Sequence, residues 1–275
     1  MKKIIINFCP TGMVPMKSVT PYVPITPQEI IEQTHHAYEI GITIVHLHAR
    51  NNDGTPTYRA DVYKQIFEGI RKYCPNLIIC GSTSGRFWSE FEKRSEVIEL
   101  NPDMCSLTLS SLNFASQASI NSPDTIIRLI QKMKDYGVRP ELECFDMGMI
   151  NYGLYLIKKG IIESPFYWNL LFGNISGIQA KINQIGIALN EIPKEHYIAL
   201  AGIGENQLPV NALAIALGYG VRIGIEDNIW WDVSQKRLAS NLEFLERIHK
   251  LMSLHGAELM TSLELGMLGF YNKYR

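Results

Sequence analysis

The sequence is poor in cysteine, and its cysteines show neither a metal-binding nor a disulfide pattern. Five occur in 275 residues, an odd number, and none belongs to a Cys-x-x-Cys pair. Scattered single thiols are typical of proteins that fold in a reducing cytoplasm, where disulfides are rare. We therefore expect a cytoplasmic protein without a thiolate zinc site. The expected free thiols are Cys9, Cys74, Cys80, Cys105 and Cys144.

The chain also lacks an excess of charge and a long apolar run. Its 26 lysines and arginines nearly balance its 27 acidic residues, which gives a formal net charge of −1. Binding to nucleic acid or to an anionic membrane requires clustered positive charge, so neither partner is expected. No apolar stretch approaches the roughly 20 residues of a membrane span. Because Met1-Lys2-Lys3 leads directly into a short strand-like run, we expect no secretory signal peptide.

A third missing pattern is the glycine-rich turn of dinucleotide-binding folds. No Gly-x-Gly-x-x-Gly follows the first strand-like run, where the chain reads Pro10-Thr11-Gly12-Met13 instead. A Rossmann nucleotide site is therefore not expected, and we expect a reaction without a redox cofactor.

Short β-branched runs alternate with amphipathic stretches along the chain. Helix starts are marked by Thr26-Pro27-Gln28-Glu29, which contains a capping box, and by Ser122-Pro123-Asp124. Eight β-then-α units without a long linker predict a (β/α)8 TIM barrel, one catalytic domain over residues 1–275, since about 250 residues is usual for this fold. A doubly wound open sheet is the alternative. The predicted strands are Ile4–Phe8, Thr43–His48, Leu77–Gly81, Met104–Leu109, Glu141–Phe145, Phe166–Phe172, Tyr197–Ala201 and Val221–Ile225.

Two histidines stand on one predicted strand, in the run Val45-His46-Leu47-His48-Ala49-Arg50. Residues i and i+2 of a strand point to the same face, so both imidazoles can reach one point. They fall at the C-terminal end of the strand, which is where the active site of a TIM barrel lies. Two histidines and one carboxylate form a common catalytic zinc set. His46 and His48 are therefore predicted metal ligands.

Two acidic residues are candidates for the third metal ligand, and a third acidic residue stands beside one of them. Glu226 is the leading third ligand because the eighth strand places it near the barrel mouth, and Glu143 on the fifth strand competes with it. An ion pair between Glu143 and a basic residue inside the barrel is an equally good interpretation. Asp227 follows Glu226 directly, so the two side chains should diverge if the strand continues. Asp227 is then a candidate base or a group that orients a ligand.

A basic residue and several hydroxyl groups accompany these carboxylates. Arg222 precedes Glu226 by four residues, so both lie on one strand face, and a buried arginine needs a partner. Its planar fork suits a substrate carboxylate, and a structural ion pair with Glu143 is the alternative. Ser82, in a Gly-Ser-Thr-Ser-Gly turn, offers a hydroxyl for an oxyanion. Further polar groups at strand ends are Ser106 and Thr108, candidates for substrate binding together with Glu143.

Several segments together, in the same order along the chain, resemble the β-keto acid cleavage enzymes. The resemblance implies a zinc-dependent barrel, usually a homotetramer. It also implies a reaction that condenses a β-keto acid with acetyl-CoA and releases acetoacetate and a new acyl-CoA. The segments are Thr20–Pro27, Val45–Arg50 followed by Asp53-Gly54-Thr55-Pro56, Leu100–Met104, Ala201–Gly204 and Gly224–Asn228.

The resemblance also assigns roles to individual residues. It implies His46, His48 and Glu226 as zinc ligands. It implies Arg222 and Asp227 as a catalytic pair, with Arg222 near the substrate carboxylate. These are residues that strand position and spacing had already selected.

Two further positions match the family, and one departs from it. Ser82 matches a substrate-binding serine, and Ser106 stands where a threonine is usual. Family members that cleave 3-keto-5-aminohexanoate have a glutamate at the position of Val14, which helps to hold the substrate's ammonium group. The valine favours a substrate with a neutral or anionic tail. Lys17 in the same loop could attract an anionic tail, although a solvated surface lysine is the simpler interpretation.

Two other functions fit the same residues. A metal-dependent aldolase or lyase would break a carbon–carbon bond on this barrel without coenzyme A. A barrel without catalytic activity would act as an oligomeric binding protein, but ligand candidates on two distant strands, His46 with His48 and Glu226, count against it.

Overall fold

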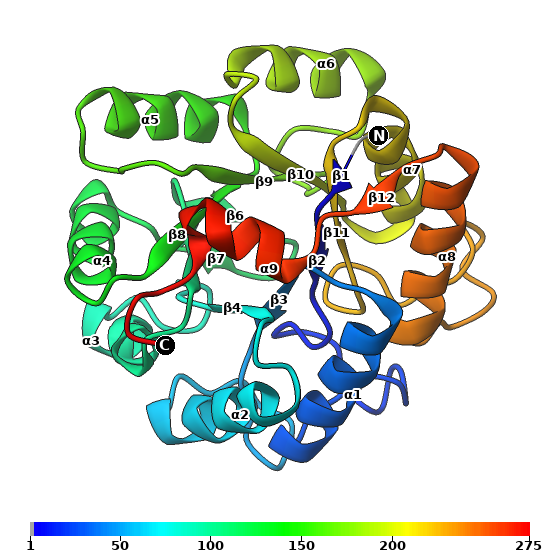
Figure 1. The fold of residues 1–275 in the computed structure, drawn as a ribbon, viewed down its shortest axis with the longest axis horizontal. Coiled ribbons are helices and arrows are strands. Elements are labelled where there is room, and N and C mark those ends of the chain that lie inside the picture. The colour runs from blue at the N-terminus through cyan, green and yellow to red at the C-terminus, as the bar shows by residue number, and fades with distance from the viewer. Residues whose placement is uncertain (1–2) are drawn as a thin grey trace.

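A closed barrel of eight parallel strands forms the centre of the protein in the computed structural model, which describes residues 3–275 (Figure 1). Met1 and Lys2, where the chain was expected to begin without a signal peptide, lie outside the described residues. The closed barrel confirms the predicted TIM fold and excludes the alternative of a doubly wound open sheet. In spatial order the strands are β10 (Tyr197–Gly202), β11 (Gly220–Ile223), β2 (Ile6–Phe8), β3 (Ile44–Leu47), β4 (Ile78–Gly81), β5 (Met104–Thr108), β8 (Arg139–Cys144) and β9 (Tyr167–Phe172).

Helices follow the barrel strands and form a ring around them (Figure 1). Both predicted helix starts are present: Thr26 and Glu29 form a complete capping box, and Ser122 accepts a hydrogen bond from the Thr125 N–H. Within residues 3–275, no helix is both long enough and apolar enough to cross a membrane. The helices are α1 (Pro27–Ile40), α2 (Ala60–Tyr73), α3 (Phe91–Ser95), α4 (Pro123–Asp135), α5 (Met147–Lys158), α6 (Ile182–Glu191), α7 (Gln207–Leu217), α8 (Asn241–Leu254) and α9 (Ser262–Leu265), with 3-10 turns at Glu96–Leu100 and Gly204–Asn206.

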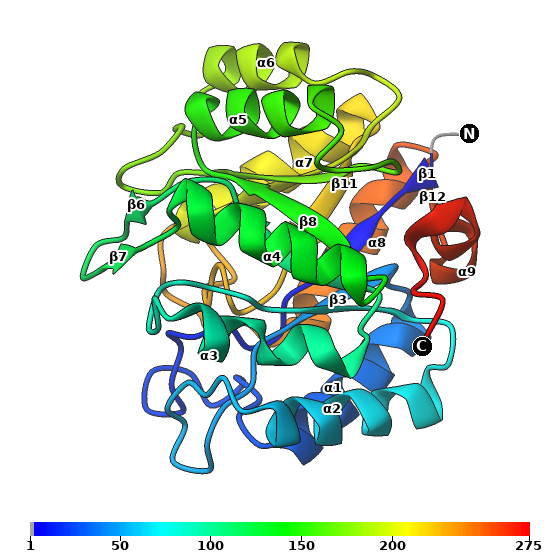
Figure 2. The same ribbon diagram turned by 90° about the vertical axis from the view of Figure 1, so that its left-hand side faces the viewer.

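Two short strand pairs lie outside the barrel and were not predicted. The expected first strand is interrupted at Ile5, so that β1 (Lys3–Ile4) pairs with β12 (Glu258–Leu259) and only β2 enters the barrel wall. A hairpin of β6 (Leu112–Asn113) and β7 (Ala118–Ser119) stands between β5 and α4. Figure 2 shows this hairpin and α9 at opposite ends of the molecule.

The C-terminal segment covers the end of the barrel at which the strands begin. Leu265 of α9 and Phe270 of the π-helical turn Gly266–Phe270 are fully buried. They belong to a core cluster with barrel residues that include Ile5 and Ile78. This end of the barrel interior is therefore apolar, and the functional side chains lie toward the other end.

All five cysteines are free, as predicted, and all five are buried. Burial raises the pKa of the Cys9, Cys80 and Cys144 thiols well above the ordinary value. A protonated thiol is a poor nucleophile and a poor metal ligand. The chemistry of the barrel must therefore come from other side chains.

Candidate active site

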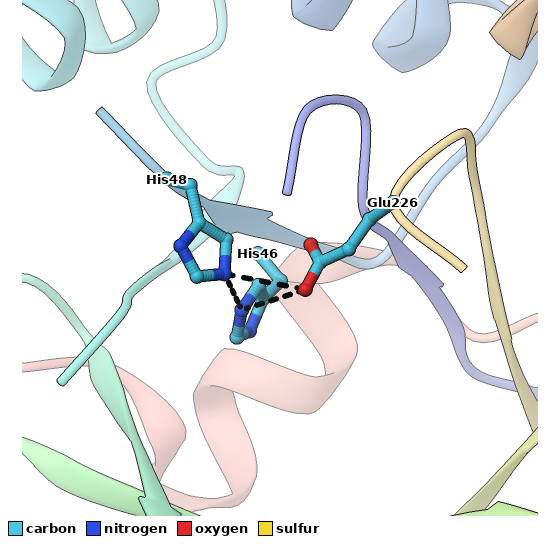
Figure 3. Close-up of side chains that lie close together, drawn as sticks. All are labelled: His46, His48 and Glu226. Carbon is cyan, nitrogen blue, oxygen red and sulfur yellow. Dashed lines mark hydrogen bonds and ion pairs between the residues drawn. The ribbon is translucent and has the colours of Figure 1, made fainter. Parts of the chain in front are cut away.

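The two predicted histidine ligands meet Glu226 at the mouth of the barrel. His46 lies on β3 and His48 just beyond it, and their Nε2 atoms are 3.2 Å apart. Oε1 of Glu226 lies 3.2 Å from Nε2 of His48 and 3.9 Å from Nε2 of His46 (Figure 3). Three ligand atoms from opposite parts of the sequence thus converge on one point.

This donor set fits a divalent metal such as zinc. Two imidazole nitrogens and a carboxylate oxygen lie within 4.8 Å of one another, which is a common zinc ligand set. Oε2 of Glu226 is buried without a hydrogen-bond partner within residues 3–275, and a cation bound by both oxygens of this carboxylate would satisfy it. A second group of neighbours, His46 with Cys80 and Glu141, is less suitable because burial keeps the Cys80 thiol protonated.

Glu141 orients the first of these ligands, and the sequence analysis missed it. Its Oε2 lies 2.7 Å from Nδ1 of His46, while the side-chain amides of Asn7 and Asn169 donate to Oε1 at 2.5 and 3.2 Å. A carboxylate that accepts the Nδ1–H of a histidine leaves Nε2 to face the metal and fixes the ring. Glu141 is therefore a positioning residue.

The charges of His46 and His48 differ. Burial lowers the pKa of His46, but the nearby carboxylates of Glu141 and Glu226 outweigh burial and raise this pKa to about 9. For His48, burial dominates and the pKa falls below its ordinary value. Burial also opposes ionisation of Glu141, yet the charge of His46 lowers its pKa to about 2. His46 and Glu141 thus form a charged pair, and a metal ion that binds Nε2 of His46 must displace a proton.

Replacing Glu141 with glutamine is expected to weaken metal binding about 10- to 100-fold, the usual effect of losing a group that orients a ligand histidine. Glutamine keeps the size of the side chain but removes the charge that holds His46. Competition with a chelator measures the affinity, with Glu246→Gln on the exposed surface of α8 as the control. Equal affinities in the two variants would mean that Glu141 only fills the barrel interior.

Arg222 on β11 is buried among three carboxylates. It donates from Nε and Nη2 to Asp227 at 2.9 and 3.3 Å, from Nη2 to Glu226 at 2.7 Å, and from Nη1 to Glu143 at 3.3 Å. The alternative of an ion pair with Glu143 is therefore realised in the structure. Burial alone would lower the pKa of Arg222, but these carboxylates hold it well above the ordinary value. A guanidinium has five N–H donors, so about one remains for a substrate.

The expected divergence of Glu226 and Asp227 does not occur, because the strand ends before them. β11 ends at Ile223, and the chain turns at Gly224, where φ is +152° and a Cβ would stand 2.0 Å from the Cys9 backbone oxygen. The turn brings both carboxylates onto Arg222. Only glycine fits a turn this close to a neighbouring strand.

The neighbouring carboxyl groups differ in how firmly they hold a proton. Burial, followed by the charge of Glu141, raises the pKa of Glu143 to about 7, and Thr108 donates a hydrogen bond to Glu143 at 2.9 Å. Burial also raises the pKa of Asp227. For Glu226, by contrast, Arg222 and the histidines outweigh burial and hold the pKa well below its ordinary value. One carboxylate thus stays ionised, as a metal ligand must, while another can exchange a proton near neutral pH.

A cavity of about 410 Å³ opens beside these groups. Met13, Phe114 and Ile175 contribute to its apolar lining. The structure brings together here nearly all residues that the sequence analysis selected. They are His46, His48, Glu226, Arg222, Asp227, Glu143, Ser82, Thr108 and Val14.

Ser106 is the selected residue that does not line this cavity in the described part of the chain. Its Oγ accepts a hydrogen bond from the Thr83 N–H at 3.1 Å, and its backbone oxygen accepts one from the Thr83 hydroxyl at 2.5 Å. Ser106 therefore supports the turn after β4, which carries Ser82. Direct contact between Ser106 and a substrate stays a prediction.

A parallel barrel that gathers histidines, carboxylates and an arginine around one cavity beyond its strands is organised as a TIM-barrel enzyme. The chain belongs to the family of beta-keto acid cleavage enzymes, whose model matches residues 3–267. The resemblance inferred from sequence segments is thereby confirmed.

Named relatives agree with this assignment, and a solved structure shares the fold. The chain is 34% identical over 265 residues to the 3-keto-5-aminohexanoate cleavage enzyme of Acetoanaerobium sticklandii, which covers 96% of this chain and 97% of the relative. It is 34% identical over 260 residues to the 3-oxoadipate:acetyl-CoA acetyltransferase of Cupriavidus necator, with 94% and 91% covered. The apo structure of ObcA superposes with a TM-score of 0.77 at 20% identity, over 90% of this chain and 66% of that chain, and shows the same fold.

Proposed function

We propose that this protein condenses a β-keto acid with acetyl-CoA to give acetoacetate and a new acyl-CoA. The names of its relatives support a reaction of this class. The observation that carries the proposal is the meeting of two groups in one cavity. The donor set of His46, His48 and Glu226 stands beside the pair formed by Arg222 and Asp227.

In this proposal a zinc ion is held by His46, His48 and Glu226. When bound, zinc would act as a Lewis acid that stabilises negative charge on the β-keto oxygen of the substrate. The protein prepares the ligands: Glu141 fixes the His46 ring, and Arg222 keeps Glu226 ionised.

The other polar groups bind the substrate and handle protons. The free N–H of Arg222 is available to a carboxylate oxygen of the β-keto acid, and Asp227 anchors the guanidinium. Glu143, with a pKa of about 7, can take up or return a proton near neutral pH. We propose that the hydroxyl group of Ser82 donates to a substrate oxygen, and that Thr108, whose proton goes to Glu143, takes part in substrate binding as an acceptor, since both residues line the cavity.

A coupled assay for acetoacetate, run over a panel of β-keto acids with and without acetyl-CoA, tests this function. We expect acetoacetate only when both substrates are present. A metal-dependent aldolase or lyase would consume the β-keto acid without acetyl-CoA, and a non-catalytic binding protein would consume none. Either of those outcomes would replace the proposed function.

The preferred substrate is expected to carry a neutral or anionic tail and not an ammonium group. Met13 and Val14 line the cavity and cannot pair with a cation, and the three carboxylates of the cavity already contact Arg222. Burying an unpaired ammonium costs several kcal/mol, so kcat/KM should be at least about 10-fold higher for a β-keto acid with a methyl terminus than for its amine counterpart. A clear preference for the amine would show that Val14 does not contact the tail.

We further propose that residues 1–275 act as one catalytic domain in a cytoplasmic homotetramer. The buried free thiols and the family resemblance support this. Light scattering of the purified protein measures the assembly, and a mass of one or two chains would contradict the tetramer.

A further inference from the structure

Arg86 lies at the active-site cavity, on the loop after β4, and has no role in the function proposed so far. The Cζ atom of its guanidinium lies 3.9 Å from the ring centroid of Phe114, which precedes β7. Stacking on an aromatic face holds the planar group in place without using its N–H donors. The guanidinium of Arg86 is therefore held at the cavity by its contact with Phe114 and not by hydrogen bonds to residues 3–275.

The guanidinium of Arg86 is unpaired within residues 3–275. Its Nε is buried and has no hydrogen-bond partner. Two other arginines of the same end of the barrel donate from all three guanidinium nitrogens: Arg50 to the carbonyl oxygens of Gly12, Gly54 and Pro15, and Arg94 to three other protein oxygens. Arg86 differs from them because its side chain donates no hydrogen bond to residues 3–275, and a buried donor of this kind needs a partner from outside the chain.

No side chain of the cavity neutralises Arg86. The cavity carboxylates contact Arg222. Partial burial lowers the pKa of Arg86 and the charge of Glu226 opposes this, but a guanidinium stays protonated at neutral pH. Lys17, the cation that the sequence had suggested for an anionic tail, is instead paired with Glu29 at 2.8 Å and does not line the cavity.

We propose that Arg86 forms an anion subsite, which takes an oxyanion group of a substrate other than the carboxylate of the reacting β-keto acid unit. A carboxylate or phosphate can accept from Nε and one Nη together, which gives Nε its missing partner. The inference rests on the proposed function, because two substrates of that reaction supply such groups. They are a second carboxylate at the tail of the β-keto acid and the phosphates of acetyl-CoA.

Steady-state kinetics of Arg86→Gln test the subsite. The matched control is Arg128→Gln, because Arg128 also stacks at 3.9 Å on a ring, that of Phe91, but lies on the surface beside Glu92. If a tail carboxylate is bound, KM for a dicarboxylic β-keto acid rises roughly 10- to 100-fold, the size expected for a lost charge-assisted hydrogen bond. KM for the methyl-terminated acid of equal length stays unchanged.

If a phosphate is bound, KM rises for acetyl-CoA but not for acetyl-pantetheine. No rise in either comparison, relative to Arg128→Gln, overturns the subsite.

A binding measurement separates failure of the subsite from failure of the proposed function, because it needs no turnover. Calorimetry compares adipate with hexanoate, and coenzyme A with pantetheine, for the unmodified protein, Arg86→Gln, Arg86→Lys and Arg128→Gln. We expect Arg86→Gln to weaken binding of one of the two anionic probes about 10-fold or more, with partial recovery in Arg86→Lys, which keeps the charge. If the unmodified protein binds neither anionic probe, or if Arg86→Gln binds both as Arg128→Gln does, the subsite is rejected even where the enzyme is active.

Discussion

Replacing His48 with alanine is expected to remove the bound metal and to lower turnover by at least about 1,000-fold while the barrel stays folded. His48 provides one of three converging ligand atoms. The metal that these atoms would hold is expected to stabilise the negative charge of the transition state by several kcal/mol. Metal content by elemental analysis, kcat/KM and thermal unfolding should be measured on the same preparation. His36→Ala is the matched control, because His36 is exposed on α1 and outside the site.

The double variant His46→Ala/His48→Ala makes the same test stricter. It leaves Glu226 as the sole member of the donor set. A full complement of metal in this folded double variant would refute the ligand assignment. Loss of metal in His36→Ala would instead point to a general effect on folding.

Replacing Arg222 with lysine is expected to lower kcat/KM by about 100-fold or more, although the charge is kept. The guanidinium contacts Asp227, Glu226 and Glu143 at the same time through Nε, Nη2 and Nη1. A lysine ammonium is a point charge without this fork, so some of these buried carboxylates lose their partner. Steady-state kinetics should be accompanied by metal analysis, because Glu226 is also a proposed ligand.

Arg71→Lys provides the comparison for this variant. Arg71 also pairs with a buried carboxylate, that of Asp103, but at the end of the barrel where the strands begin. The Arg71→Lys variant should have a lower thermal stability than the unmodified protein but the same kcat/KM. If Arg222→Lys proved as active as the unmodified protein, Arg222 would be a structural residue and the catalytic pair with Asp227 would be withdrawn.

The barrel and the histidine pair were predictable because both depend on local patterns. Strand alternation alone puts His46 and His48 on one face, and the Thr26 and Ser122 caps mark helix starts whatever the rest of the chain does. The same rule also places Glu141 on the face of Glu143, so the signal for the residue that orients His46 was present. To select Glu141 from the sequence, one would need to know that β8 is the third strand from β3 around the barrel and that the two side chains meet inside it.

The remaining details depend on contacts between segments far apart in the chain. Glu226 and Asp227 meet on Arg222 because Gly224 turns against Cys9, a contact that no local pattern contains. The short β6–β7 hairpin brings Phe114 to Arg86, and a two-residue strand carries too little alternation to be recognised. The contact of Ser106 is also made between distant segments, because its hydrogen-bond partner Thr83 lies in the turn after β4. No local pattern around Ser106 contains this contact.

The most direct test of the proposed reaction follows the acetyl group of acetyl-CoA. Exchange between a β-keto acid and acetyl-CoA balances only if the acetyl group joins the two-carbon carboxylate unit and the acyl group of the β-keto acid passes to coenzyme A. With acetyl-CoA labelled with ¹³C in the acetyl group, mass spectrometry should find the label in acetoacetate and an unlabelled acyl group in the new thioester. Loss of the β-keto acid without labelled acetoacetate would contradict the account.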